Sequence, residues 1–361
     1  MIALPASARL YLRPTQFVDS PIGHPDGAVA RLAGGLLWFA AWELSVVEGA
    51  SITRHHLPVA ALPDDPRLAA IAARVTAPRG ALQLGERVVR LDQPQVMGIL
   101  NMTPDSFSDG GRHLDDPAAA AQAGFDMGVH GAAIIDVGGE STRPGAAEVW
   151  EGDEIARVVP VIEQLARSGT AVSIDTRRAG VMEAALAAGA HVVNDVAALL
   201  YDPRALDVVA KAQCPVVLMH SPDPEAGGHG EGGYQHVLFD VYNWLEKRVD
   251  AVVAAGVDRS RILIDPGIGF GKSLQENCAL LNGLALFHGI GSAIVLGASR
   301  KRMVGALSNE APASERLGGS LTLALKGADL GVQLIRVHDV FETAQAVRVW
   351  RGLRDVALVG R

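Results

Sequence analysis

The chain contains few cysteines. Only Cys214 and Cys278 occur among its 361 residues, and neither lies in a CxxC motif or at the histidine spacing of a zinc site. Two cysteines are too few for a disulfide-stabilised scaffold of the kind found in small exported domains. We therefore expect a protein of the reducing cytoplasm that relies on its hydrophobic core.

Long apolar runs and an excess of positive charge are also absent. The longest apolar stretch, residues 36–42, is far shorter than the ~20 residues that a membrane-spanning helix needs, and the N-terminus lacks the pattern of a signal peptide. The formal net charge of -8 argues against nucleic-acid binding, which needs a basic face. We expect small-molecule substrates and neither a membrane nor a nucleic-acid partner.

Length and composition favour a large α/β fold with many tight turns, since 49% of the residues are hydrophobic and 40 are glycine. Eight short apolar runs begin at Val96: 96–100, 132–135, 171–174, 191–193, 216–218, 262–264, 293–296 and 334–337. Segments with helical periodicity separate them, including 118–129, 154–167, 181–188, 234–255 and 316–330. Strands that are apolar throughout are buried on both faces, and a count of eight predicts a closed (β/α)8 TIM barrel rather than an open sheet.

Nearly every predicted strand ends in a functional polar group. These groups are Asn101, Asp136, Asp175, Asn194, His220, Asp265, Ser299, Arg300, Lys301, Arg336 and His338. A single Asp or Asn in such a place is as readily explained as the cap of the next helix. Eight strand ends together are hard to explain as caps, and in such barrels the active site lies at the carboxyl ends of the strands.

The stretch 98–111 stands out, because an apolar strand runs into a polar loop with an amide, carboxylates and hydroxyls. It opens a series of motifs: NMTPDSFSDGG (101–111), DVGGESTRPG (136–145), SIDT (173–176), ND (194–195), DPGIGFGK (265–272), SRK (299–301) and RVHD (336–339). In order and spacing these motifs resemble those of the dihydropteroate synthases, over about residues 95–353. The resemblance implies that a 6-hydroxymethyl-7,8-dihydropterin diphosphate condenses with p-aminobenzoate, and that pyrophosphate is released on the way to tetrahydrofolate.

A pterin presents an edge of hydrogen-bond donors and acceptors, so its site needs buried carboxylates and amides. By resemblance the ring is held by Asp175, Asn194 and Asp265. Such a site rejects analogues that leave its polar groups unpaired. Met219 and Phe270 can offer apolar faces to the ring, and Lys301 would reach a ring acceptor. For Phe270 simple packing stays an alternative.

Departure of the diphosphate needs cations that stabilise the growing negative charge. By resemblance the pyrophosphate is gripped by Arg143, Arg336 and His338, and Thr142 also binds the pterin diphosphate. Asn101 would ligate Mg²⁺, which prefers hard oxygen ligands. The implied mechanism is dissociative, with a pterin cation stabilised by Asp109 and no strong general base. Asp109, Arg143 and Lys301 are the expected catalytic residues.

The p-aminobenzoate is expected against the first two loops. Phe107, Pro144 and Phe270 are the predicted aryl contacts. Its carboxylate would lie at the N-terminus of the helix after Lys301, where backbone N–H groups favour an anion. Many relatives carry a small hydroxyl residue after the SRK motif, whereas this chain has Arg302, which either pairs with the carboxylate or faces solvent.

Three other signals have simpler explanations. Residues 267–273 look like a P-loop, but Pro266 stands where the first glycine is required, so we expect no ATP site. The histidines near the glycine-rich loop 221–233 are more consistent with a flexible connection than with a metal site. Glu140 could act as a general acid or could organise its own loop.

Residues 1–94 lie outside the resemblance and are rich in proline, whereas 95–361 form the predicted catalytic barrel. Clustered apolar residues in the first part, such as 36–42, predict a small α+β extension packed on the barrel rather than a disordered tail. By resemblance a homodimer is expected. The alternatives are a methyltransferase of the same barrel family, a non-catalytic pterin-binding paralogue and, more distantly, a Schiff-base aldolase using Lys301.

Overall fold

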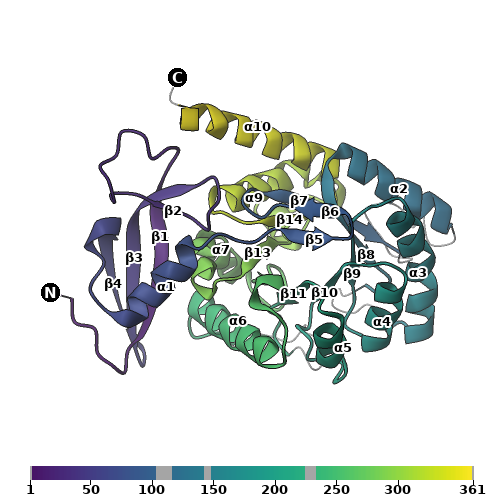
Figure 1. Cartoon of the computed structure of the whole chain (residues 1–361), viewed down its shortest axis with the longest axis horizontal. Helices are drawn as coiled ribbons and strands as arrows, with labels where there is room; N and C mark the ends of the chain where they lie inside the picture. The colour runs from purple at the N-terminus through teal and green to yellow at the C-terminus, as the bar shows by residue number, and fades with distance from the viewer. Residues whose placement is uncertain (1, 103–115, 142–147, 224–232, 360–361) are drawn as a thin grey trace.

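The computed structural model describes residues 2–102, 116–141, 148–223 and 233–359. Eight parallel strands in this part close into a barrel in chain order, and the last pairs with the first (Figure 1). They are β7 (Gln95–Asn101), β8 (Ala132–Gly138), β9 (Val172–Asp175), β10 (Val192–Asp195), β11 (Val216–Met219), β12 (Ile262–Asp265), β13 (Ala293–Leu296) and β14 (Leu334–Val337). The predicted (β/α)8 barrel is therefore confirmed.

Several strands extend by one to three residues beyond the predicted apolar runs and include polar residues. Asn101 pairs with Gly138 in the ladder between β7 and β8, and Gly138 pairs with Asp175 on its other side. Asp175 in turn pairs with Asn194. Because these residues belong to the sheet, the barrel fixes their backbones, which is how a rigid site is built.

Helices surround the barrel. They are α2 (Pro117–His130), α3 (Glu151–Arg167), α4 (Ala179–Ala187), α5 (Ala205–Ala212), α6 (Val237–Ala254), α7 (Leu274–Asn282), α8 (Arg302–Ala306), α9 (Leu317–Asp329) and α10 (Val340–Val359). Local chemistry sets their starts: Asp116 caps α2 by accepting from Ala118 and Ala119 N–H groups, and Ser273 with Glu276 forms a capping box at α7. None of the described helices is long and apolar enough to cross a membrane.

A hairpin closes the amino end of the barrel. It consists of β5 (Leu82–Leu84) and β6 (Arg87–Val89), which pair antiparallel. Leu82, Leu84 and Val89 share one buried cluster with inward-facing strand residues such as Met97 and Ile134. This end of the barrel is therefore filled with apolar side chains.

The N-terminal extension is a small α+β unit, as predicted. Its antiparallel sheet consists of β1 (Arg9–Val18), β2 (Ala30–Arg31), β3 (Trp38–Glu48) and β4 (Ser51–Pro58), with β3 pairing with the other three. The short helix η1 (Val59–Ala61) leads to α1 (Pro66–Thr76), and Leu68, Ile71 and Val75 of α1 join the sheet's core. Figure 1 shows this unit beside the barrel, at the purple end of the chain.

Tyr11 of β1 joins the extension to α6. Its ring stacks on Phe239 with centroids 4.2 Å apart and meets Tyr242 edge-on at 5.5 Å. Its hydroxyl donates a hydrogen bond to Asn243 Oδ1 at 3.0 Å. The extension is therefore docked by aromatic packing and a polar contact on the same helix.

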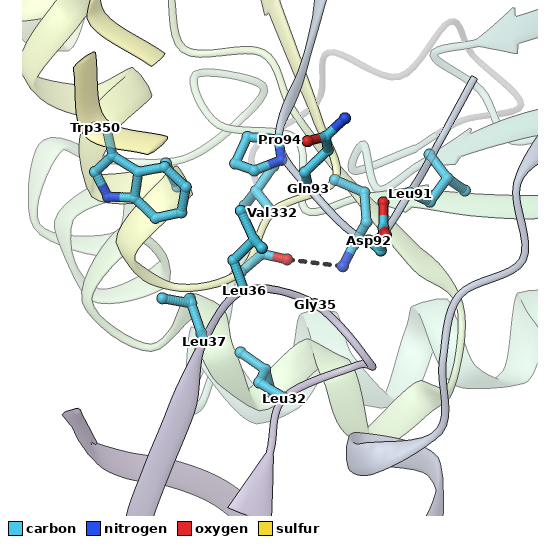
Figure 2. A pocket seen from close by; sticks show the side chains of 13 residues that line it. Leu32, Gly35, Leu36, Leu37, Leu91, Asp92, Gln93, Pro94, Val332 and Trp350 are labelled. Atoms are coloured by element: carbon cyan, nitrogen blue, oxygen red, sulfur yellow. Dashed lines mark hydrogen bonds between the residues drawn. The ribbon is translucent and has the colours of Figure 1, made fainter. Parts of the chain in front are cut away.

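A second seam runs between the extension, the segment 91–94 that leads into β7, and α10. Figure 2 shows a small pocket there, with Leu36, Leu37, Pro94 and Trp350 among its lining residues. Its volume is about 20 Å³, which is room for one water and far too little for a metabolite. We assign it no binding role.

Candidate functional site

Polar side chains from neighbouring strands converge at the carboxyl end of the barrel. Strands β14, β7, β8, β9 and β10 lie side by side and carry Arg336, Asn101, Asp136, Asp175 and Asn194. Gly138 lies within this group, next to Asn101 and Asp175. A Cβ atom added there would lie 3.5 Å from both Asn101 Oδ1 and Asp175 Cβ.

Arg336 links two carboxylates. Its Nε donates to Asp136 Oδ2 at 2.6 Å, and its Nη2 donates to Asp175 Oδ2 at 2.5 Å. Asn194 Nδ2 donates to the same Asp136 oxygen at 2.9 Å. Three of the residues predicted for the site are thus brought together around Asp136. The sequence marks Asp136 as a strand-end carboxylate and gives it no further role, so its position at the end of a strand is the signal that points to it.

Two oxygens of this cluster stay available for a ligand. Asp136 Oδ1 and Asp175 Oδ1 are buried and have no hydrogen-bond partner among the described residues. A buried acceptor without a partner carries a free-energy penalty that a ligand's N–H donor would relieve. The arrangement therefore suits a flat ligand with several N–H groups along one edge.

Burial shifts the ionisation of the site. It raises the pKa of Asp175 to about 7, against the opposing effect of Arg336 and with a further upward contribution from Asp136. Burial also raises the pKa of Asp265, with Lys301 opposing it. For Arg336 burial lowers the pKa, but Asp136 and Asp175 more than offset this, and the guanidinium stays charged.

Lys301 and Phe270 form the next wall of the site. Lys301 Nζ donates a hydrogen bond to the Ile268 carbonyl and lies 4.4 Å from the centroid of the Phe270 ring. Burial lowers the pKa of Lys301 to about 8, although Asp265 opposes the shift. Phe270 therefore contacts the ammonium group of Lys301, and the predicted roles of both residues stay predictions.

Asp265 and Met219 end adjacent strands and pair in the ladder between β12 and β11. Both are buried, with exposed fractions of 5% for Asp265 and 4% for Met219. One Asp265 oxygen accepts from the Gly267 N–H at 2.7 Å. This bond shapes the turn that follows, so the carboxylate is held in one orientation.

The three residues of the SRK motif (299–301) make different contacts. Ser299 Oγ lies 3.1 Å from His338 Nδ1, and Arg300 Nε donates to Asp339 Oδ2 at 3.0 Å. These contacts tie the segment after β13 to the segment after β14. Lys301, the third residue of the motif, lies over the Phe270 ring.

Glu140 is held in a structural network. Its carboxylate accepts from Arg178 Nη2 at 2.9 Å, from Arg177 Nε at 3.2 Å and from the Val149 N–H at 3.2 Å. Two guanidinium groups and a backbone bond leave it poorly suited to proton transfer. The structure thus favours the interpretation of Glu140 as an organiser of its loop.

Histidines flanking the glycine-rich loop are engaged within the fold. His220 Nδ1 lies 3.1 Å from Lys272 Nζ, and the His236 ring stacks on Phe239 at 4.2 Å. Burial, followed by the charge of Lys272, lowers the pKa of His220 to about 3. No group of three or more His, Cys, Asp or Glu residues in the described part of the chain could hold a metal ion.

Five predicted site residues lie outside the described residues: Phe107, Asp109, Thr142, Arg143 and Pro144. Their predicted roles stay predictions. Arg302 is the first residue of α8 and is exposed, and Lys301 makes no side-chain cap there. The predicted carboxylate site at this helix start also stays a prediction.

Comparisons with known proteins agree with one another. The family model described as "Pterin binding enzyme" matches residues 97–338. The dihydropteroate synthase of Escherichia coli K12 is 45% identical over 260 residues, which cover 72% of this chain and 91% of that protein.

Solved structures resemble the barrel in the same way. A Xanthomonas albilineans dihydropteroate synthase with 4-aminobenzoic acid is 44% identical, with a TM-score of 0.71, and covers 76% of this chain and 98% of that one. The enzyme from the same organism in complex with 7,8-dihydropteroate is 41% identical, with a TM-score of 0.67 and the same coverages. These relatives match about three quarters of this chain and nearly all of their own length.

Proposed function

Since this chain belongs to the pterin-binding enzyme family, as a dihydropteroate synthase, we propose that its barrel joins 6-hydroxymethyl-7,8-dihydropterin diphosphate to p-aminobenzoate and releases pyrophosphate. The observation that carries the proposal is the cluster of Asp136, Asp175, Asn194 and Arg336, with two buried acceptor oxygens that have no partner within the described part of the chain. The related structures with 4-aminobenzoic acid and with 7,8-dihydropteroate support it.

The cluster would hold the pterin ring. Asp175 and Asp265 accept from its N–H groups, and the Asn194 amide pairs with the same edge. Arg336 and Asn194 already orient Asp136 by two hydrogen bonds, so its free oxygen offers a fixed acceptor. Met219 and Phe270 would offer apolar faces to the ring, and Lys301 would donate a hydrogen bond to a ring acceptor. Such preorganised groups favour one ring orientation.

The diphosphate would lie toward Asn101 at the end of β7. The Asn101 amide oxygen is a hard donor that lies beside Gly138, and one such protein ligand together with phosphate oxygens and water suits Mg²⁺. When bound, the ion would neutralise charge on the diphosphate. Thr142, Arg143, Arg336 and His338 would bind the same group.

The reaction would be dissociative. The bond between the exocyclic methylene carbon and the diphosphate oxygen breaks with its electron pair on oxygen, and the pterin carries the positive charge. Asp109 would stabilise that cation, while Arg143 and Lys301 complete the predicted catalytic set. The neutral arylamine of p-aminobenzoate then forms the new C–N bond and loses a proton. A weakly basic amine of this kind needs no strong general base.

The p-aminobenzoate would contact Phe107, Pro144 and Phe270, with its carboxylate at the first N–H groups of α8.

We further propose a homodimer, supported by exposed apolar side chains along α10 such as Phe341, Val349 and Leu353. A cytoplasmic location is consistent with two free cysteines. We place the boundary between the extension and the catalytic barrel near residue 94.

Pyrophosphate release by the purified full chain tests the function. We expect release that requires the dihydropterin diphosphate, p-aminobenzoate and Mg²⁺ together, and that collapses in Arg336→Ala but not in Arg351→Ala, a change at a half-exposed arginine of α10. Pterin binding without release would indicate a binding paralogue, and the absence of any pterin binding would contradict the proposal.

A further inference from the structure

The loop after β12 carries the near-P-loop motif to which the sequence could assign no nucleotide. Gly267, Gly269 and Gly271 all have positive φ, at 70°, 82° and 55°. Alternate glycines in this region let the backbone turn sharply and direct its carbonyl groups inward. Gly267 also lies against the end of β11, since a Cβ atom on it would stand 1.9 Å from the His220 carbonyl oxygen.

Lys272 ends this loop and folds back into it. Its Nζ lies 2.9 Å from the Gly267 carbonyl oxygen, 3.1 Å from the Phe270 carbonyl oxygen and 3.1 Å from His220 Nδ1. The His220 carbonyl oxygen is 3.4 Å away. The amine thus binds carbonyl groups of the loop, whereas a P-loop presents backbone N–H groups to a phosphate.

The ionisation of the neighbouring groups fits this arrangement. His220 has a pKa lowered to about 3 by burial, so it is neutral and its Nδ1 can accept from the lysine. Burial also lowers the pKa of Lys272 to about 7, with a contribution from the nearby Lys301. A lysine held so tightly among acceptors has little freedom to reach a substrate.

Two groups within the same loop contact Lys301. The Ile268 carbonyl accepts from Lys301 Nζ, and the Phe270 ring lies 4.4 Å from it. The two carbonyls held by Lys272, those of Gly267 and Phe270, flank the Ile268 carbonyl along the chain. Holding these two carbonyls therefore fixes the direction of the third.

We propose that Lys272 is a positioning residue that acts through Lys301: it holds the loop of residues 267–271 so that the Ile268 carbonyl and the Phe270 ring place the Lys301 amine in the pterin site. The inference rests on the proposed function and deepens it. Asn277 supports the loop from the other side, where its Oδ1 accepts from the Gly269 N–H at 2.6 Å and its Nδ2 donates to the Lys272 carbonyl at 3.0 Å.

A double-mutant cycle tests this inference. Lys272→Met keeps the apolar stem and removes the donors, and Lys301→Met removes the amine that it is proposed to place. We expect Lys272→Met to lower kcat/KM for pyrophosphate release by roughly 10 to 100-fold, as for other small misplacements of an active-site group. In the Lys301→Met background the same change should cost less than about threefold, because residues that act together are not additive.

The matched control is Lys211→Met, the same chemical change at an exposed lysine of α5, which should leave activity unchanged in both backgrounds. If Lys272→Met fails to fold, Lys272→Gln, which retains an N–H donor group on a shorter stem, replaces it in the cycle. An unchanged rate in the Lys272 variant, or an equal loss in both backgrounds, would overturn the inference.

Binding of 6-hydroxymethyl-7,8-dihydropterin to the same proteins separates this inference from the proposed function. Absence of pyrophosphate release by the unmutated chain would contradict the function. The pterin affinities would still test Lys272: we expect roughly tenfold weaker binding in Lys272→Met when Lys301 is present, and less than a twofold change in the Lys301→Met background. Equal losses in the two backgrounds would exclude action through Lys301.

Discussion

The two ends of the barrel differ in the polarity of the side chains that fill them. At the amino end the hairpin residues Leu82 and Leu84 are 4% and 2% exposed, and they join a cluster made of apolar side chains. At the carboxyl end Asp136, Asp175 and Arg336 form hydrogen-bonded ion pairs, and two carboxylate oxygens lack partners among the described residues. The amino end is therefore filled by apolar packing, whereas the carboxyl end retains two hydrogen-bond acceptors for a ligand.

This difference links the amino ends of the strands to stability and their carboxyl ends to function. Burial of apolar surface stabilises the amino end without directional demands. Burial of charges at the carboxyl end costs solvation free energy, which the pairing recovers only in part. Changes at the amino end should therefore lower the free energy of unfolding, and changes at the carboxyl end should lower activity.

The largest expected effect is at the carboxyl end. Asp136→Asn weakens the acceptor that Arg336 and Asn194 share and places an N–H donor against them. Since a small misplacement of active-site groups can cost about 10²-fold in rate, we expect kcat/KM for pyrophosphate release to fall by about 10² to 10³-fold. Steady-state kinetics measures the loss at a temperature where the variant is folded, because removing one charge of a buried pair also lowers the free energy of unfolding.

Asp207→Asn, at an exposed aspartate of α5, is the matched control. It makes the same chemical change without disturbing the site. If Asp136→Asn kept activity within tenfold, the shared acceptor would not organise the site, and the functional contrast between the two ends would fail.

The next effect is at the amino end. Leu84→Ala removes a side chain that is 2% exposed and packed in the cluster below the strands. We expect the free energy of unfolding to fall by about 3 kcal/mol, from lost transfer free energy and a residual cavity, with kcat unchanged. Urea unfolding measures the first and pyrophosphate release the second.

Val88 on the same hairpin is 60% exposed, so Val88→Ala should change the free energy of unfolding by less than about 0.5 kcal/mol. A large loss of kcat in Leu84→Ala at temperatures where the variant is folded would show that the hairpin also supports the site. That result would break the separation of roles.

A smaller effect depends on pH. Burial raises the pKa of Asp175 to about 7 from 3.8, so the folded, unliganded protein holds a proton there below pH 7. Binding of a pterin N–H needs the ionised carboxylate, and the proton must leave first. We expect pterin affinity to weaken toward lower pH, by up to about tenfold per pH unit below 7. Calorimetric titration between pH 5.5 and 7.5 measures this.

The same carboxyl group has an opposite effect on stability. Between pH 3.8 and 7 the folded state binds the proton that the unfolded state has released, so its contribution to the free energy of unfolding falls as pH rises. Asp175→Asn should flatten both dependences. Pterin affinity that did not vary with pH in the unmutated protein would contradict the raised pKa of Asp175.

The sequence predicted the barrel better than it predicted the contacts within the site. Strands buried on both faces are apolar throughout, so their positions were readable, and strand order followed from the count of eight. The hydrogen-bond partners of Arg336 could not be predicted from the sequence, because they lie 200 and 161 residues away in the chain. Barrel closure brings them together, so Arg336, whose predicted role at the diphosphate stays a prediction, also pairs with Asp136 and Asp175.

For the extension, the sequence predicted the α+β character but not the individual strands. Its α+β character followed from clustered apolar residues, but β4 (Ser51–Pro58) is an edge strand with many exposed positions and no apolar run. Leu82 and Leu84 were grouped with the extension by sequence, whereas they pack into the base of the barrel. Short apolar segments do not indicate which core they will join, since that depends on tertiary contacts.

The smallest expected effect concerns the docking of the extension on α6. Tyr11→Phe retains the stacking on Phe239 and removes the hydrogen bond to Asn243. We expect the free energy of unfolding to fall by about 1 kcal/mol, with kcat unchanged. In an Asn243→Ala background the same substitution should have little further effect, because the partner is already gone. A loss of activity in Tyr11→Phe, measured on folded protein, would mean that the extension acts on the site through α6, and the comparison of the two barrel ends would then have to include a third functional region.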